Sequence, residues 1–384
     1  MTRHTGPVIR AEPLPTDRLH EVITDELARR RADVLAVDGR LAGSVDLLVE
    51  FVSDGGKRLR PEFLWCGWLA GGGSGSRPEA DAVLRVGAAL ELLQACALVH
   101  DDVIDRSERR RGRPATHRAV AKQHIDDGLA GDPEHYGTSV AVLLGDLALA
   151  WADDLFLAGA AELAAIPAAA PVWRAVRTEV LAGQLLDLAV AASVERDPAV
   201  QERDAVRVNR YKTAAYTVER PLHLGATLAG APAATVSALR RYGADIGVAF
   251  QLRDDLLGVF GDPTVTGKPA GDDLAEGKRT VLLAAARAAL AGDPDSAAAL
   301  TELDAGIGRP NSDRDTARLT DLIAGSGAVD AVEARVAALV ASGLAALDGA
   351  GREGAGREGA GSALSDPVRA RLVELAEVAT ARHR

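Results

Sequence analysis

Apolar residues recur with the period of an α-helix from about Leu19 onward, at spacings of three and four positions. Long stretches with this period predict helices at about residues 138–165, 171–192, 204–229 and 233–260. The strict alternation of apolar and polar residues that marks a half-buried strand is not convincing anywhere. The pattern therefore predicts an all-α protein, built as a single large helical bundle.

Turn-forming residues separate the predicted helices. "GGGSGS" at 71–76 divides one helix from the next, and "QHIDDGLAGDPEHYG" at 123–137 is predicted to be a surface loop. Residues 1–17 are predicted to form a flexible arm, and "GAGREGAGREGAG" at 349–361 a low-complexity linker. One domain is expected over residues 18–384, with this linker inside it.

The composition excludes several classes of function. The 384-residue chain has a net charge of -11, which argues against broad binding to nucleic acid or anionic membranes. Cys66 and Cys96 are its two cysteines, too few and too far apart for a disulfide framework or a zinc site. The N-terminus lacks the apolar core of a signal peptide, and acidic residues interrupt the most apolar stretch. We expect a cytoplasmic protein without a membrane span.

The segment "DDVID" at 101–105 follows a helix that is apolar on nearly all sides. On a helix, Asp101 and Asp105 lie one turn apart on one face, and Asp102 flanks them. Neighbouring carboxylates repel one another unless a cation lies between them. Mg²⁺ suits this arrangement because it prefers oxygen ligands and completes its shell with water and phosphate oxygens.

A second acidic pair, Asp254 and Asp255 in "FQLRDDLLGVFGD", also ends an apolar helix, with Gln251 one turn before Asp255. Two such helix ends could hold several Mg²⁺ ions that stabilise a diphosphate as a leaving group. Basic segments suited to phosphate occur in the same region. They are "GGKRLRP" at 55–61, "RRRGRP" at 109–114, Lys212 in "YKTAAY" and Lys268 in "VTGKPAGDD".

Together these segments resemble the trans-isoprenyl diphosphate synthases, or polyprenyl synthetases, from about Gly55 to Thr280. "DDVID" is similar to the first Asp-rich motif of that family, and "FQLRDDLLG" to the second. "GGKRLRP" resembles the isopentenyl-diphosphate motif, "GQLLDL" at 183–188 the mid-chain motif, and "KTAAY" the allylic-side lysine motif. The resemblance implies an all-α bundle around a deep central cavity, usually as a homodimer.

The resemblance also implies roles for individual residues. The metal ligands would be carboxylates that hold three Mg²⁺ ions, with Asp102 in support: Asp101, Asp105, Asp187, Asp254, Asp255 and Asp273. The allylic diphosphate would contact Arg110, Lys212 and Lys268, whereas isopentenyl diphosphate would contact Lys57, Arg60, Gln94 and Arg111. Thr213 and Gln251 would line the reacting centre.

The second acidic segment departs from the family pattern at one position. Gly258 stands where many relatives have a third aspartate. Asp272 or Asp273 could compensate, and the spacing to "EGK" favours Asp273 as the loop aspartate of the family.

The implied activity is that of a Mg²⁺-dependent transferase of isoprenoid biosynthesis. Loss of the allylic diphosphate leaves a carbocation, isopentenyl diphosphate attacks it, and the released diphosphate takes up the proton. Cys96 and Ala97 precede the first acidic motif by five and four positions, where bulky residues stop chain growth in this family. Two small residues there favour the twenty-carbon geranylgeranyl diphosphate; a farnesyl or a longer product remains open.

Two rival functions are less consistent with the residues. A class I terpene cyclase shares the fold and the first motif, but its second motif needs a hydroxyl and a glutamate that Gly258 and Asp262 do not provide. A cyclase also has no use for an isopentenyl-diphosphate site. A non-catalytic synthase subunit would be expected to have lost acids of the first motif, and all three are present here.

Overall fold

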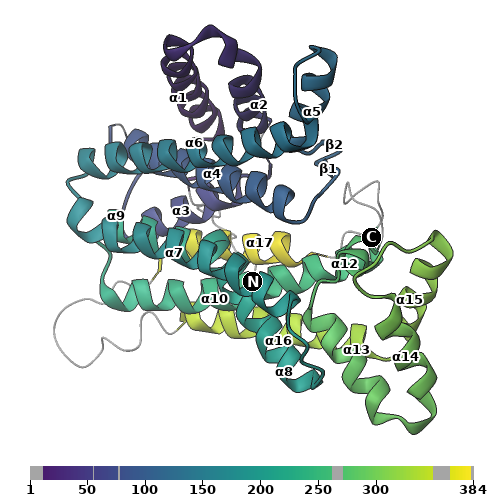
Figure 1. The fold of residues 1–384 in the computed structure, drawn as a ribbon. Helices are drawn as coiled ribbons and strands as arrows, with labels where there is room; N and C mark the ends of the chain where they lie inside the picture. The colour runs from purple at the N-terminus through teal and green to yellow at the C-terminus, as the bar shows by residue number, and fades with distance from the viewer. Residues whose placement is uncertain (1–11, 55, 77, 262–270, 349–363, 382–384) are drawn as a thin grey trace, which may run out of the picture. The chain divides into compact units, whose positions relative to one another are not determined.

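The computed structural model describes residues 12–54, 56–76, 78–261, 271–348 and 364–381, and these residues are helical almost throughout (Figure 1). The prediction of an all-α protein is confirmed. The chain divides into two compact units. Unit 1 comprises residues 1–177, 220–240 and 347–374, and unit 2 comprises residues 178–219, 241–346 and 375–384.

Most helices belong to one unit. Unit 1 contains α1 (Thr16–Val37), η1 (Gly39–Leu41), α2 (Ala42–Ser53), α3 (Leu59–Ala70), α4 (Glu79–Ile104), α5 (Thr116–Asp126), α6 (Pro133–Glu162) and α9 (Arg220–Leu228). Unit 2 contains α8 (Pro198–Val208), η2 (Asn209–Glu219), α12 (Asp272–Glu276), α13 (Val281–Gly292), η3 (Pro294–Ser296), α14 (Ala297–Gly306) and α15 (Asp313–Gly325). Four helices carry residues of both units: α7 (Ile166–Ala191), α10 (Ala233–Phe260), α16 (Ala328–Asp348) and α17 (Asp366–Thr380).

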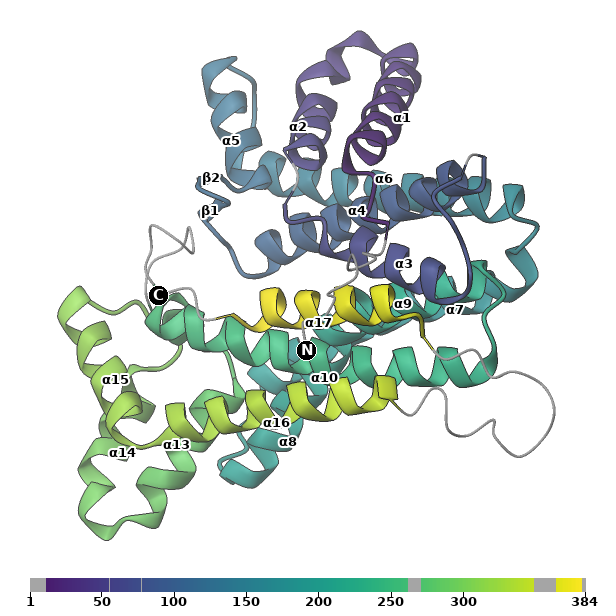
Figure 2. The ribbon, with the colours of Figure 1, turned by 180° about the vertical axis from the view of Figure 1, so that it is seen from behind.

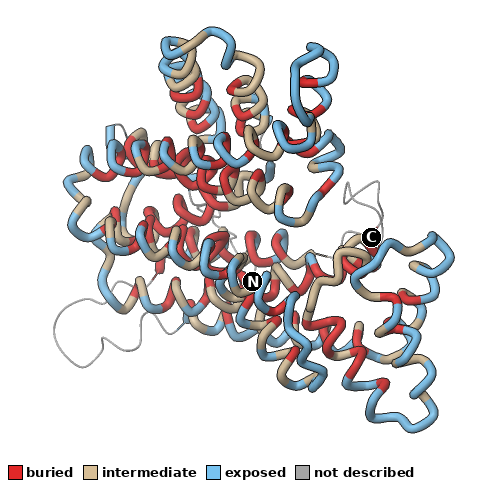
Figure 3. The backbone as a smooth tube through the Cα atoms, in the orientation of Figure 1, coloured by how far each residue is buried: buried red, intermediate tan, exposed pale blue. Residues whose placement is uncertain are grey.

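Helix α4 is the core of unit 1 and is buried along most of its length (Figure 3). It packs against α1, α3 and α6, which explains why its sequence is apolar on nearly all sides. Glu79 and Asp81 lie in its first turn, where negative charge is favourable to the helix dipole. Among the described helices, α4 alone is long and apolar enough to cross a membrane, but 78% of its most apolar window is buried within the protein.

Helices α3 and α9 of unit 1 touch through glycines. A Cβ atom at Gly67 would meet the backbone of Leu222, and one at Gly225 the backbone of Leu64, at separations under 3.0 Å. This close contact fixes α3, whose N-terminus at Leu59 lies within the "GGKRLRP" segment. Figure 2 shows α1 and α2 side by side in the same unit.

Unit 2 has its own core, formed by α10, α13 and α16 around residues such as Leu252, Leu282 and Val336. Arg253, next to the second acidic pair, donates two hydrogen bonds to Glu333 of α16 at 2.6 and 2.7 Å and one to the carbonyl of Thr380 at 3.1 Å. These bonds tie the end of α10 to two later helices.

Several predicted boundaries are wrong. The predicted loop at 123–137 is mostly helical, because α5 extends to Asp126 and α6 begins at Pro133 with Asp132 as its cap. The predicted helix at 204–229 is three elements, α8, η2 and α9, of which η2 is a π-helix. α1 begins at Thr16, inside the predicted arm, and Leu14 before it is buried.

A short antiparallel hairpin, β1 (Arg109–Arg110) and β2 (Arg113–Pro114), was not predicted. The predicted linker at 349–361 lies outside the described residues, as does Lys268.

Candidate active site

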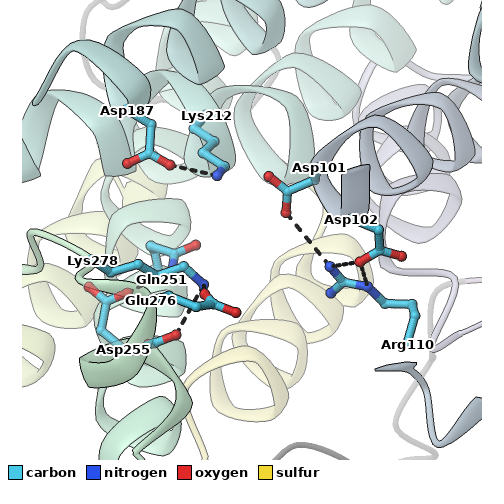
Figure 4. Close-up of polar contacts among 10 residues, drawn as sticks. Asp101, Asp102, Arg110, Asp187, Lys212, Gln251, Asp255, Glu276 and Lys278 are labelled. Carbon is cyan, nitrogen blue, oxygen red and sulfur yellow. Dashed lines mark hydrogen bonds and ion pairs between the residues drawn. The ribbon is translucent and has the colours of Figure 1, made fainter. Parts of the chain in front are cut away.

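The first acidic motif lies at the C-terminal end of α4 in unit 1. The Asp102 side chain is fully buried, with 0% exposure. Arg110 of β1 donates to Asp102 Oδ1 from Nε at 2.8 Å and from a terminal nitrogen at 2.6 Å (Figure 4). The same guanidinium lies 3.7 Å from the Asp101 carboxylate. A buried carboxylate needs such a partner, so Arg110 fixes the end of α4 to the hairpin.

This pairing gives Arg110 a role that the sequence did not predict. Its guanidinium neutralises Asp102 and approaches Asp101, whereas phosphate contact remains a prediction. Asp105 caps α4, one turn after Asp101, as the spacing predicted.

The hairpin turn also places Arg111. Arg111 and Gly112 both have positive φ angles, 52° and 75°, as a tight two-residue hairpin turn requires. The Arg111 guanidinium lies 5.3 Å from the centre of the Phe51 ring and close to Gly56 of the "GGKRLRP" segment. The hairpin thereby brings together two basic segments that are far apart in the sequence.

Arg58 holds the start of α3 in place. It has a left-handed backbone, with φ 49°, and pairs with the buried carboxylate of Glu91 on α4. It also donates to the Val52 carbonyl at 3.0 Å. Gln94 follows Glu91 by three positions on α4, which puts these two residues on neighbouring positions of one helix face.

The arginines of this region are close enough to perturb the titration of Arg111. Burial lowers the pKa of the Arg111 guanidinium, although part of that side chain still reaches solvent. The positive charges of Arg58, Arg110 and Arg60 lower this pKa further, whereas the negative charge of Glu91 raises it. With exposed Lys57 beside it, this basic cluster (Lys57, Arg58, Arg60 and Arg111) suits a ligand with several negative charges.

In unit 2, the π-helix η2 carries Lys212 and Thr213 at its most closely packed part. A Cβ atom at Gly183 of α7 would lie 2.6 Å from Lys212 Cα, and one at Gly247 of α10 would lie 2.7 Å from Ala214 Cα. Only glycine allows the backbones to come so close. π-helical turns are rare and often mark functional positions.

Helix α7 also holds the side chain of Lys212. The Lys212 amine donates to Asp187 at 2.7 Å (Figure 4), and Asp187 follows Gly183 by one helical turn. One face of α7 therefore fixes both the backbone and the amine of Lys212. The sequence predicted Asp187 as a metal ligand, and the structure adds this ion pair.

The second acidic segment ends α10. Asp255 is buried and accepts hydrogen bonds from Gln251 at 2.8 Å and from Asn209 at 3.3 Å, whereas Asp254 is exposed. Burial raises the pKa of Asp255 to about 7; the charges of Asp273 and Asp254 raise it as well, and the two donors act against them. Asn209 begins η2 and was missed in the sequence, since a lone asparagine in a helical pattern carries no signal.

These carboxylates suit Mg²⁺ by their chemistry. Among the residues that the structure describes, no group of three His, Cys, Asp or Glu side chains encloses a metal by itself. Mg²⁺ does not need such a cage, because it keeps waters and binds one or two carboxylates together with phosphate oxygens. The raised pKa of Asp255 means that burial and the nearby carboxylates destabilise its charged form more than its two hydrogen-bond donors stabilise it. A bound cation would stabilise that charged form.

His100, which precedes the first motif, is held between α4 and α6. Its Nε2 lies 3.0 Å from the Val142 carbonyl, and its Nδ1 lies 3.7 Å from the Cys96 sulfur. Burial raises the pKa of the Cys96 thiol to about 12, so this side chain stays protonated. The side chains of His100 and Cys96 therefore pack beside the first acidic motif.

Comparison with known proteins gives a consistent result. The family model described as polyprenyl synthetase matches residues 45–318. The chain is 34% identical over 294 residues to the geranylgeranyl diphosphate synthase of Mycobacterium tuberculosis, covering 74% of this chain and 75% of that protein. It is 33% identical over 304 residues to the geranylfarnesyl diphosphate synthase of Aeropyrum pernix, covering 77% and 83%.

A solved structure is similar over nearly the whole chain. It is a geranylgeranyl pyrophosphate synthase from Corynebacterium glutamicum, complexed with isoprenyl diphosphate and magnesium. Its TM-score is 0.85 at 44% sequence identity, and the match covers 96% of this chain and 99% of that one.

Substitution of Gly183 tests the backbone contact that positions Lys212. We expect Gly183→Ala to lower kcat by roughly tenfold or more, since a misplacement of about 1 Å can cost far more than that. The KM for isopentenyl diphosphate should not change, because the basic cluster belongs to unit 1. Steady-state kinetics check this, with Gly292→Ala as the control, since a Cβ atom there meets nothing within 4 Å. A wild-type kcat in Gly183→Ala would contradict the assignment.

The raised pKa of Asp255 predicts a pH dependence of stability in EDTA. Between about pH 4 and pH 7 the unfolded chain loses this proton while the folded protein keeps it, so the free energy of unfolding should fall as the pH rises. The loss should approach about 4 kcal/mol and then level off. Denaturant titrations of the wild type and Asp255→Asn measure it. Equal pH slopes in the two proteins would show that Asp255 is not the group responsible.

Proposed function

Because the chain belongs to the polyprenyl synthetase family, and is therefore a trans-prenyl diphosphate synthase that joins isopentenyl and allylic diphosphates, we propose that its main product is geranylgeranyl diphosphate. The observation that carries this proposal is the pair of small residues before the first acidic motif. Cys96 is 1% exposed and Ala97 is partly exposed, and neither is bulky enough to stop chain growth at fifteen carbons.

The next large side chains along α4 are Leu93 and Leu90, both buried. Each turn of helix adds about 5.4 Å of depth, close to the length of one isoprene unit. A barrier one turn beyond Ala97 therefore favours a product of twenty carbons. Trp65 and Trp68, the other bulky residues near this part of the chain, donate their indole N–H groups to the carbonyls of Glu12 and Ser74.

The basic cluster is proposed to bind isopentenyl diphosphate. Lys57, Arg60 and Arg111 would contact the phosphate oxygens, with Gln94 as a further donor. The repulsion that Arg111 experiences from its arginine neighbours supports this, since a dianionic or trianionic ligand would remove it. Arg58, held by Glu91, would keep the segment in its binding conformation.

The allylic diphosphate is proposed to bind at the acidic motifs and Lys212. The carboxylates proposed to hold Mg²⁺, three ions in all, are Asp101, Asp105, Asp187, Asp254, Asp255 and Asp273. Mg²⁺, which the family uses, supplies Lewis-acid stabilisation of the departing diphosphate when it is bound. Lys212 would add a positive charge at the leaving group, as would Arg110 and Lys268. Thr213 and Gln251 would lie against the allylic cation, Gln251 oriented by Asp255.

Water and bases must stay away from the allylic cation until the new bond has formed. His100 would not act as such a base, because its two ring nitrogens face the Val142 carbonyl and the Cys96 sulfur. The proton released after condensation would then pass to the departing diphosphate.

A homodimer and a cytoplasmic location complete the proposal. Leu143 and Leu157 on α6 are 62% and 48% exposed, and their spacing puts them on one face of the helix. Exposed leucines aligned on a helix suit contact with another protein surface. A second copy of this chain is the partner that we propose. The mostly buried α4 is consistent with a cytoplasmic enzyme.

Product length tests the main proposal. We expect the wild type to make twenty-carbon product from isopentenyl diphosphate and a shorter allylic starter. Ala97→Phe should shift the product to fifteen carbons, because the ring would block the path along α4. Leu98→Phe is the matched control, since residue 98 lies about 100° around the helix and is partly exposed as well. A wild type that stops at fifteen carbons, or an Ala97→Phe variant that keeps a longer product, would refute the proposal.

The dimer proposal is tested by charge on α6. Leu143→Glu combined with Leu157→Glu should convert the dimer to a monomer, because buried unpaired carboxylates oppose association. Sedimentation velocity measures the mass. Val37→Glu, at a position that is 80% exposed on α1, should leave the dimer intact. A monomeric wild type, or a double variant that remains dimeric, would rule out this surface.

A further inference from the structure

The π-helix η2 is long for its kind. It runs over 11 residues, Asn209–Glu219, whereas most π-helical stretches are single turns inserted into an α-helix. η2 follows α8 directly and continues directly into α9. Since the chain is α-helical on both sides, contacts within unit 2 must favour the wider π-helical winding over one continuous α-helix.

Two glycines of α10 contact η2 at positions that match this winding. A Cβ atom at Gly243 would lie 2.5 Å from Glu219 Cα, and one at Gly247 would lie 2.7 Å from Ala214 Cα, so backbone lies against backbone at both places. Gly243 and Gly247 are about one turn apart on one face of α10. Ala214 and Glu219 are five residues apart, which stacks them in a helix with i→i+5 hydrogen bonds. In an α-helix, five residues turn by about 500°, so the two would not share a face.

An ion pair between Arg210 and Glu219 also matches the π-helical winding. It joins the second residue of η2 to the last. In an α-helix, at about 3.6 residues per turn, the nine positions between them make two and a half turns and put the residues on opposite sides. A π-helix has roughly 4.4 residues per turn, so nine positions complete about two turns and both residues lie on one face. An α-helical winding would therefore break this ion pair.

Burial makes the ion pair costly to break. The Glu219 side chain is 1% exposed and that of Arg210 is 28% exposed. Removing the partner of a buried charge is strongly destabilising, because little water replaces the lost interaction. Rewinding η2 as an α-helix would separate the Glu219 carboxylate from Arg210, so the ion pair opposes this change.

Lys212 and Thr213 lie within η2, between the two ends of the ion pair. We propose that Glu219 is a positioning residue: its ion pair with Arg210 holds η2 in the π-helical winding, and this winding places the Lys212 amine against Asp187. The inference rests on the proposed contact between Lys212 and the allylic diphosphate. The hold of the ion pair on the winding does not depend on that contact.

Glu219→Gln tests the proposal, because it removes the charge and keeps the size of the side chain. Backbone amides of residues 209–219 should exchange hydrogen roughly tenfold faster or more, since η2 opens more readily without the ion pair. kcat should fall by roughly tenfold or more, as a displacement of about 1 Å can cause, and the KM for isopentenyl diphosphate should not change. Glu202→Gln is the control, because it breaks an ion pair with Arg335 in the same unit but outside η2, and it should change none of these quantities.

Hydrogen exchange measured by mass spectrometry separates the two parts of the proposal. Unchanged exchange in residues 209–219 of Glu219→Gln would overturn the inference, whatever the activity. Faster exchange with a wild-type kcat would refute the role of Lys212 at the allylic diphosphate, and the positioning role with it.

A paired apolar substitution separates positioning from stability. Replacing both partners of a buried ion pair with apolar residues often restores stability. Arg210→Met combined with Glu219→Leu should therefore recover the thermal midpoint of the wild type. Its kcat should stay as low as that of Glu219→Gln, because apolar side chains lack the charge-assisted bond that selects the winding. A kcat that recovered together with the thermal midpoint would show that the pair only stabilises the fold, and would overturn the proposal.

Discussion

The burial of like charges close to one another is the constraint on which the candidate site depends. In unit 1, burial lowers the pKa of the Arg111 guanidinium, and its arginine neighbours lower it further. In unit 2, Asp255 is buried near Asp254 and Asp273, and its pKa rises to about 7. Such clusters oppose folding and persist because the surrounding helices are rigid. Each is stabilised by a ligand of the opposite charge, a diphosphate for the arginines and a cation for the carboxylates.

Glycines determine the positions of the reactive groups as much as the charged residues do. Gly183 lets the Lys212 backbone approach α7, and Gly258 lets the Asp273 carboxylate approach α10. In both places a neighbouring ion pair completes the arrangement, Asp187 with Lys212 and Lys278 with Asp273. At Gly183 the contact is between two backbones, so no side chain that could rotate lies between them. The charged groups are thereby fixed before any ligand arrives, which reduces the cost of binding.

The sequence predicted the helices and the charged motifs, because helical periodicity and clustered acids are local signals. It could not predict η2, since a π-helix has nearly the same apolar pattern as an α-helix. It missed the hairpin that carries Arg110, because two residues per strand show no alternation. The pairing of Arg110 with Asp102 depends on that hairpin and was missed with it. The loop predicted at 123–137 was wrong because polar residues there cover the exposed faces of α5 and α6.

The most direct test of this account is whether the basic cluster binds isopentenyl diphosphate without metal. Calorimetric titration in EDTA should detect binding to the wild type, and Arg111→Gln should weaken it by roughly tenfold or more, as expected for the loss of a charge-assisted hydrogen bond. Arg109→Gln, on the same hairpin but bonded to the Gly112 carbonyl, should bind as the wild type does. If the wild type did not bind isopentenyl diphosphate in EDTA, or if Arg111→Gln bound it as tightly as the wild type, the result would contradict the account.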